Sequence, residues 1–142
     1  VRSIIKKEKI DKKTSKDLLK PTKIYTKEIL KLANKNLIHA TAHITGGGLI
    51  ENLLRSVPND LTVNLDLAKI KITRIFKWIK NRNISESEML KTFNCGVGFC
   101  IIAPKKNLNK IKHFFSSQYK PYVIGHLSKD KKKLYVKNSL RW

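Results

Sequence analysis

The chain has 142 residues, of which 41% are hydrophobic, and its 31 lysine and arginine residues against 10 aspartate and glutamate residues give a formal net charge of +21. This length suits one domain around one core. No apolar run approaches the roughly 20 residues of a membrane-spanning helix, and two cysteines, Cys95 and Cys100, are too few for a disulfide framework and match no zinc-ligand spacing. We therefore expect a cytoplasmic protein without a membrane partner, with buried thiols and without a metal site of its own.

The positive charge comes mostly from lysine. Only five of the 31 basic residues are arginine, whereas recognition of phosphates and bases in nucleic acids favours the forked guanidinium group. The lysines are spread along the whole chain together with many isoleucines and asparagines, and a codon usage rich in A and T accounts for all three. We therefore expect nucleic acid to bind only nonspecifically, and a lysine-rich nucleic-acid-binding module is the alternative hypothesis.

In the first half of the chain, the hydrophobic pattern predicts helices and strands in alternation. Tyr25, Ile29 and Leu32 lie on one stripe of a helix, and the segment LTVNLD alternates apolar and polar residues as a half-buried strand does. We expect the basic first twenty residues to be loosely held. In chain order, the predicted elements are a helix at 21–34, a strand at 38–44, a helix at 49–56 and a strand at 61–66.

The second half of the chain continues this alternation. Ser85 and Glu88 have the spacing of a capping box, and VGFCIIA is a continuous apolar run typical of a central strand covered on both faces. The last two strands are predicted to form a hairpin through KDKKK. The predicted elements are helices at about 72–79 and 85–90, a strand at 97–103, a helix at 107–117, and strands at 122–128 and 133–137. Such an order predicts an α/β or α+β fold, with helices packed on a mixed β-sheet.

The most distinctive stretch is TGGG, Thr45 to Gly48, between a predicted strand and a predicted helix. Glycine loses more backbone freedom on folding than any other residue, so three in succession need a reason. One reason is an anion site, where a phosphate reaches the main chain and the first N–H groups of the helix from Leu49. The other is a tight turn that requires positive φ. The residues alone leave both open, and the pattern is neither a Walker A loop nor a dinucleotide fingerprint.

Polar residues around the glycines are candidates for contact with a ligand. His43 could serve in acid–base catalysis or charge stabilisation, or it could be a core histidine with one hydrogen bond. His39 faces the same side of the strand and is the weaker candidate. Thr45 could donate its hydroxyl to an anion or cap the turn. Asn52 could reach a ligand from the first helical turn, whereas Glu51 would repel an anion.

A second glycine-containing stretch, TFNCGVGFC, opens the strand predicted at 97–103. Gly96 and Gly98 flank Val97 there, which indicates a close approach of other atoms to the backbone. Asn94 offers a side-chain amide at the same edge. Taken alone, this stretch is a weak signal for a site.

Three segments together closely resemble one protein family. They are LKPTKIYTKEIL (19–30), IHATAHITGGGLIENLLRSVPND (38–60) and MLKTFNCGVGFCIIAP (89–104). They resemble the second half of aminoimidazole ribonucleotide synthetase, also called phosphoribosylformylglycinamidine cyclo-ligase, in order along nearly the whole chain and including YVIGHL (122–127). The opening VRSII is similar to the residues that follow this family's HSNG motif. The resemblance implies that residues 1–142 form a single carboxy-terminal domain of a longer enzyme, without its ATP- and Mg²⁺-binding amino-terminal half.

The resemblance also implies a function. The family is a nucleotide-binding, ATP-dependent ligase of purine biosynthesis, which converts formylglycinamidine ribonucleotide and ATP to aminoimidazole ribonucleotide, ADP and phosphate. ATP and Mg²⁺ would be held mostly by the amino-terminal half, and the full-length enzyme would be a homodimer. This chain alone would be inactive. It would supply His43 as a catalytic residue, and it would bind substrate or its phosphates through Thr45, Gly46, Gly47, Gly48, Asn52, Asn94 and Gly96. Whether the glycine turn holds the ATP phosphates or the ribose 5′-phosphate is left open.

Overall fold

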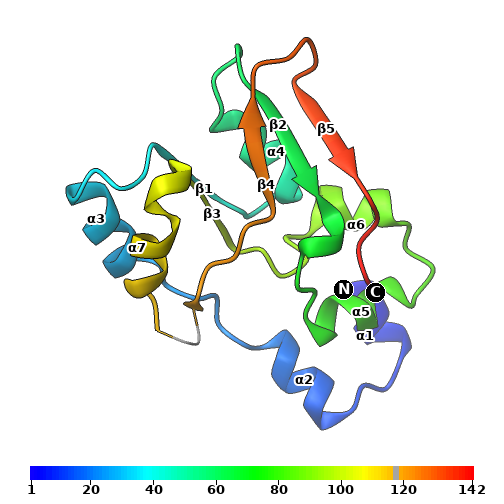
Figure 1. The fold of residues 1–142 in the computed structure, drawn as a ribbon. Helices are drawn as coiled ribbons and strands as arrows, with labels where there is room; N and C mark the ends of the chain where they lie inside the picture. Colours follow the sequence, from blue (N-terminus) through cyan, green and yellow to red (C-terminus); the bar gives the residue numbers. More distant parts are fainter. Residues whose placement is uncertain (117–118) are drawn as a thin grey trace.

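The computed structural model describes residues 1–116 and 119–142, which form two small β-sheets surrounded by helices (Figure 1). Within this part of the chain, no helix is long and apolar enough to cross a lipid bilayer. In chain order, the elements are α1 (Arg2–Lys7), α2 (Lys12–Leu18), α3 (Thr26–Asn34), β1 (Ala40–His43), α4 (Gly48–Arg55), β2 (Thr62–Asp66), the short 3₁₀ turn η1 (Leu67–Lys69), α5 (Arg74–Lys80), α6 (Glu86–Thr92), β3 (Phe99–Ile102), the 3₁₀ turn η2 (Lys105–Asn107), α7 (Leu108–His113), β4 (Gly125–Ser128) and β5 (Leu134–Lys137).

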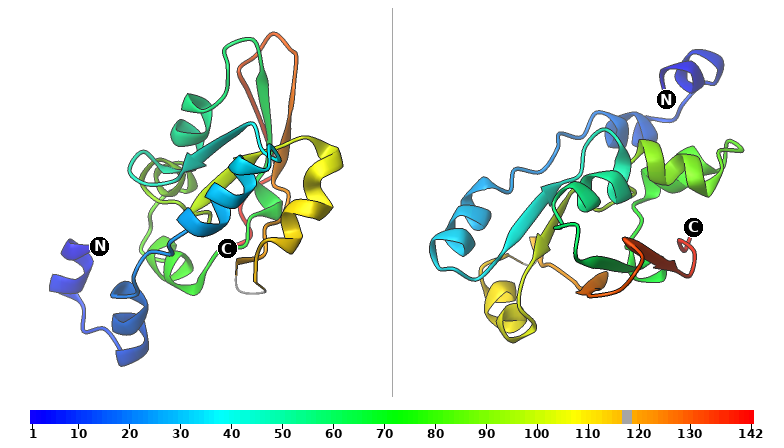
Figure 2. Two further views of the ribbon diagram at one scale, coloured as in Figure 1. Left: turned by 90° about the vertical axis from the view of Figure 1, so that its left-hand side faces the viewer. Right: turned by 90° about the horizontal axis from the view of Figure 1, so that it is seen from above.

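The strands divide between two sheets. β1 and β3 form an antiparallel pair in which His43 lies opposite Phe99. β2 is the centre of the second sheet, antiparallel to β4 and parallel to β5. Figure 2 shows α3 lying along the β1–β3 pair, with α1 and α2 at the edge of the molecule. The predicted mixed α/β architecture is therefore confirmed.

Two details of the predicted sheet are wrong. β4 and β5 do not form a hairpin, because β2 lies between them and pairs with both. The Thr62 hydroxyl donates to the Lys132 carbonyl at 2.6 Å, and the Val63 amide donates to the Lys133 carbonyl at 3.0 Å, so the connection between β4 and β5 passes the start of β2. β3 is not a central strand, because among the described residues it pairs with β1 alone, and of its four residues only Cys100 is fully buried.

Local sequence signals account for most element boundaries. Half of the predicted capping box is observed: the Ser85 hydroxyl accepts a hydrogen bond from the Glu88 amide at 3.1 Å, whereas the Glu88 carboxylate accepts from the Thr92 hydroxyl at 2.8 Å. α3 is shorter than predicted and begins at Thr26, after an irregular segment that starts at Pro21. α7 ends at His113, and the predicted last residue of that helix, at position 117, lies outside the described residues.

The first twenty residues form the short helices α1 and α2. The Asp11 carboxylate caps α2 by accepting hydrogen bonds from the Thr14 amide at 2.8 Å and the Thr14 hydroxyl at 2.6 Å. One ion pair, Arg74 with Asp17 at 2.8 Å, links α2 to α5. Exposed pairs of this kind contribute about 1 kcal/mol or less, so α2 is attached mainly through the buried Thr14 and its neighbours.

The core lies between the two sheets and is closed by α4, α5 and α6. Alternation places Ala42 of β1 inward, and Val63 and Leu65 of β2 face the same core. Asp66 is a buried charged residue at the end of β2, and it accepts a hydrogen bond from the Asn138 side chain at 2.8 Å. Fully or nearly fully buried members of the core include Ile44, Leu49, Leu53, Ile79, Met89, Cys95, Val97 and Cys100.

We predict that both thiols are inert in the native protein. Burial raises the pKa of Cys95 to about 11 and that of Cys100 to about 12, and the thiolate is the reactive species. A disulfide exchange reagent at mildly alkaline pH should label neither cysteine in the folded chain and both after unfolding in guanidinium chloride. Rapid labelling of either thiol in the native state would contradict the burial described here.

Candidate functional site

The two glycine-containing stretches meet at one end of the β1–β3 pair. Because these strands are antiparallel, the end of β1 lies beside the start of β3. The Ile44 amide donates to the Gly98 carbonyl at 3.0 Å and continues the pairing beyond His43. The turn at 45–48 and the turn at 94–97 therefore lie at the same edge of the molecule, and α4 leads away from it to pack on β1 and α6.

Backbone conformation explains Gly47, and backbone conformation together with tight packing explains Gly48. Gly47 and Gly48 have φ values of 89° and 68°, in the left-handed region that favours glycine. A Cβ on Gly48 would lie 1.9 Å from the carbonyl oxygen of Leu90 in α6, and a Cβ on Gly47 would lie 2.5 Å from a carboxylate oxygen of Glu51. At these two positions, the tight-turn hypothesis is sufficient.

Gly46 has no such explanation. Its φ lies outside the left-handed region, its surface is exposed, and a Cβ built there would have no described atom within 4 Å. Neither the backbone nor the packing of the described chain requires glycine at this position. The missing side chain instead leaves open the approach to the main chain, which is what an anion site needs.

The amides available to an anion differ from those expected. The Gly48 amide donates to the Thr45 carbonyl at 3.3 Å, and Leu49 is completely buried, because the start of α4 packs against α6. The Gly48 and Leu49 amides are therefore closed to a ligand, whereas the N–H group of the partly exposed Ile50 has no acceptor among the described residues, so the expectation that this helix offers a free N–H group stays a prediction there. Gly46 is exposed and Gly47 is half-buried, and the N–H groups of both lack an acceptor among the described residues.

Asn52 braces the turn from within α4. Its side-chain nitrogen donates to the carbonyls of Gly46 at 2.9 Å and Gly48 at 2.7 Å. Both amide hydrogens are thereby used to hold the turn, and only the side-chain oxygen of Asn52 is left for a ligand. Glu51 lies beside Gly47, and its carboxylate is paired with Arg55. That pairing offsets the repulsion that the carboxylate would exert on an anion at the turn.

His43 lies on the exposed face of β1, two residues before Thr45, which is also exposed. Its imidazole has no hydrogen-bond partner among the described residues, so it is not the core histidine of the alternative interpretation. Its ring centroid lies 5.7 Å from that of Phe99 and 6.5 Å from that of Tyr25. His39, at the other end of β1, is exposed and distant along the strand from the glycine turn.

Sequence reasoning missed Tyr25 and Phe99 as site residues. Their rings are 5.1 Å apart and, with His43, line a hollow of about 480 Å³ to which Ile29 and Leu30 of α3 contribute. Burial raises the pKa of Tyr25, so its hydroxyl stays protonated at neutral pH. Tyr25 also explains Gly98, because a Cβ there would lie 2.4 Å from the tyrosine hydroxyl oxygen. Tyr25 could have been found in the sequence, because it lies in a segment that resembles the family. Phe99 could not, because its position beside His43 follows from the pairing of β1 with β3.

The second turn, Asn94 to Val97, also has a structural explanation. The Asn94 side-chain oxygen accepts from the Gly96 amide at 3.0 Å, and its carbonyl accepts from the Val97 amide at 2.8 Å. Gly96 has a φ of 103°, and a Cβ there would lie 2.6 Å from the Lys71 carbonyl oxygen. Asn94 and Gly96 thus shape the edge of the site, and a direct contact with substrate stays a prediction for both.

The described residues contain no group of three or more His, Cys, Asp or Glu side chains that could hold a metal ion. The site offers main-chain N–H donors, the imidazole of His43 and an aromatic wall formed by Tyr25 and Phe99. Such a set can bind an anion and a flat or apolar group side by side.

Comparison with known proteins identifies the family. Residues 1–137 match the family described as AIR synthase related protein, C-terminal domain. The chain belongs to this family. It is 43% identical over 122 residues to the phosphoribosylformylglycinamidine cyclo-ligase of Geotalea daltonii and 40% identical over 114 residues to that of Lactobacillus helveticus. It is also 44% identical over 113 residues to the trifunctional purine biosynthetic protein adenosine-3 of Chironomus tentans.

These alignments cover 84%, 79% and 78% of this chain but only 35%, 33% and 8% of the three relatives. The chain thus spans about a third of the length of the two cyclo-ligases. The sequence-based assignment to the AIR synthase related family is confirmed. The aligned carboxy-terminal domain contains the glycine turn, His43 and the aromatic wall.

The fold requires glycine at position 48 but not at position 46, and this difference leads to a prediction about stability. Gly48→Ala should lower the free energy of unfolding by about 2 kcal/mol or more, because alanine would be strained at this φ and would collide with the Leu90 carbonyl. Gly46→Ala should change it by less than about 0.5 kcal/mol. Urea denaturation of both variants beside the wild type measures the difference. Equal losses would mean that Gly46 is also required by the fold.

Proposed function

We propose that this chain is the carboxy-terminal domain of an ATP-dependent phosphoribosylformylglycinamidine cyclo-ligase of purine biosynthesis. The reaction would convert formylglycinamidine ribonucleotide and ATP to aminoimidazole ribonucleotide, ADP and phosphate. The observation that carries the proposal is the family match over residues 1–137, which contains the complete glycine-turn site. Two cyclo-ligases that are 40% and 43% identical to the chain support it. The nucleic-acid-binding alternative has no support from these relatives.

In this proposal, the chain contributes a phosphate-binding edge to a larger active site. The Gly46 and Gly47 N–H groups would donate to a phosphate of the substrate or of ATP, each with about 1.5 to 3 kcal/mol for a charge-assisted hydrogen bond. Asn52 keeps both groups directed outward by holding the turn carbonyls. Thr45, exposed at the start of the turn, would add its hydroxyl to the same anion.

The chemistry of the reaction is phosphoryl transfer followed by ring closure. ATP with Mg²⁺ supplies the phosphoryl group that turns the formyl amide oxygen into a leaving group. The amidine nitrogen then attacks the same carbon, and phosphate departs. The main-chain donors at Gly46 and Gly47 would stabilise negative charge on a phosphate, and the His43 imidazole would move a proton or stabilise charge beside it. Tyr25 and Phe99 would fix the orientation of that ring.

The proposal includes a larger polypeptide. The cyclo-ligases that match are about three times as long as the aligned part, and the segments that hold ATP and Mg²⁺ would lie in the amino-terminal portion. We further propose a cytoplasmic homodimer and an isolated chain without activity. If the gene encoding this chain specified no amino-terminal portion like that of the relatives, and no separate subunit supplied one, the proposal would fail.

We predict that Gly46→Ala in the complete enzyme lowers kcat/KM by about 10²-fold, because a methyl group that keeps an anion away from the main-chain N–H groups should cost about as much as the loss of one such donor. The added methyl group would occupy the open approach to the turn while leaving the fold intact. Steady-state assays of ring closure measure the loss, and Lys129→Gln, an exposed residue of the β4–β5 connection, is the control. If the Gly46→Ala enzyme had wild-type activity, the hypothesis that an anion binds at this turn would be wrong, and the family assignment would stand.

His43 has a separate test. His43→Ala should reduce kcat by about 10²-fold, with a smaller change in KM, if the imidazole takes part in proton transfer or in stabilising charge. Because His43 is exposed and makes no described hydrogen bond, the substitution should leave the melting temperature nearly unchanged. Turnover equal to that of the wild type would exclude His43 from the mechanism.

A further inference from the structure

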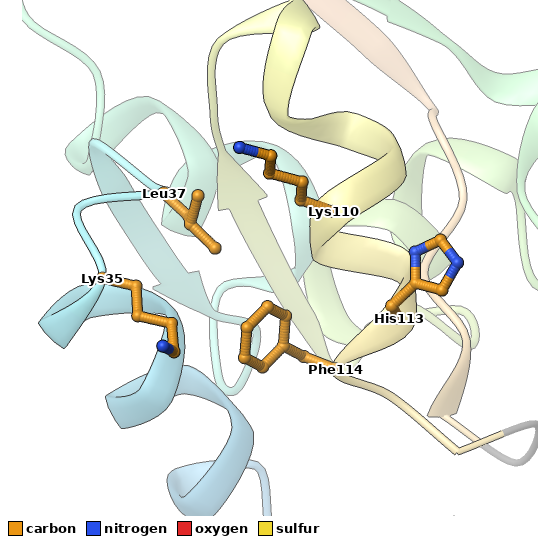
Figure 3. A pocket seen from close by; sticks show the side chains of 5 residues that line it. All are labelled: Lys35, Leu37, Lys110, His113 and Phe114. Carbon is orange, nitrogen blue, oxygen red and sulfur yellow. The ribbon is translucent and has the colours of Figure 1, made fainter.

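A second hollow lies at the other end of the β1–β3 pair, between α3 and α7. Residues 35–37 lead from α3 into β1, and α7 follows β3 through η2, so this hollow is at the end opposite the glycine turn. Its volume is about 570 Å³. Leu37 and Phe114 form an apolar floor in the space between the two helices, with Lys35 and Lys110 at its ends (Figure 3). We call it the α3–α7 groove.

The two lysines of the groove have no counter-charge within the described chain. The side-chain amine of neither Lys35 nor Lys110 forms an ion pair or a hydrogen bond with a described residue, and both residues are exposed. The two segments that build the groove, 29–50 and 89–129, contain no aspartate or glutamate. An anion that neutralises these ammonium groups therefore has to come from outside these segments.

The arrangement of the four side chains restricts the kind of anion. Figure 3 shows the amines of Lys35 and Lys110 on opposite sides of the Leu37–Phe114 floor, and they do not converge on one point. His113 also lines the groove, but its Nδ1 donates to the Asn109 carbonyl at 2.6 Å, and its ring points away from Phe114. A single small anion would meet one lysine and leave the apolar floor uncovered.

We propose that the α3–α7 groove binds a small molecule that has a flat, apolar middle and an anionic group at each end. The middle would lie on Leu37 and the ring of Phe114, and each anionic group would meet one lysine. Solvent-exposed ion pairs are individually weak, so binding depends on both ends and the middle together. The inference is independent of the proposed function, because it uses none of the residues of the glycine turn.

The test compares two rigid aromatic probes that differ in one carboxylate. Naphthalene-2,6-dicarboxylate and 2-naphthoate are titrated into the 142-residue chain at low ionic strength. Amide chemical shifts locate the binding, and fluorescence measures affinity. The dianion should bind about 3- to 5-fold more tightly than the monoanion, and its shifts should concentrate at 35–37 and 110–114. Shifts centred on 45–48, or equal affinities, would overturn the proposal.

Because the chain carries a net charge of +21, any dianion is attracted to it, and matched variants are needed. Lys35→Gln and Lys110→Gln should each abolish the tighter binding of the dianion relative to the monoanion. Lys129→Gln removes the same charge elsewhere and should preserve that tighter binding. Phe114→Leu should weaken both probes equally and leave their ratio unchanged. If Lys129→Gln reduced the ratio as much as the groove variants, the attraction would be nonspecific and the proposal would be wrong.

Discussion

The antiparallel pairing of β1 with β3 is the constraint on which the rest of the site depends. It sets Ala42 opposite Cys100 in the core and His43 opposite Phe99 on the outer face. Because side chains alternate along a strand, a shift of one residue in β1 would turn His43 inward and Ala42 outward. The buried Ala42 and Ile44 therefore fix the direction of the imidazole and the point at which the chain leaves the sheet toward the glycines.

The glycine turn serves the fold and the site through different residues. Gly48 allows α4 to approach the carbonyl of Leu90, and Gly47 provides the left-handed backbone that begins the helix. That packing buries Gly48 and Leu49, so the first two residues of the helix are closed to a ligand, and the partly exposed Ile50 is the first that could offer a free amide. Gly46 is exposed at the outer end of the turn, and Asn52 holds its carbonyl. The candidate site is consequently centred on the turn before α4, where the Gly46 and Gly47 N–H groups lack an acceptor among the described residues.

Local patterns in the sequence were enough to predict most elements, the mixed architecture and the family. They could not give strand partners, because pairing depends on contacts between distant segments. Thus β4 and β5 have the sequence of a hairpin but lie on either side of β2, and VGFCIIA is apolar because β3 packs on the core with one face and contacts Tyr25 with the other. The same limit hid Phe99, whose importance follows from its position opposite His43.

The two hollows have a common structural origin. A sheet of two strands is marginal alone and must be covered to be stable, and α4 and the core cover one face of the β1–β3 pair. α3 lies along the pair (Figure 2) but is only nine residues long, so it leaves the two ends incompletely covered. At one end, Tyr25 and Phe99 shield the exposed strands beside His43, and at the other end Leu37 and Phe114 do so between two lysines. A short helix on a short sheet therefore creates two hollows of different chemistry.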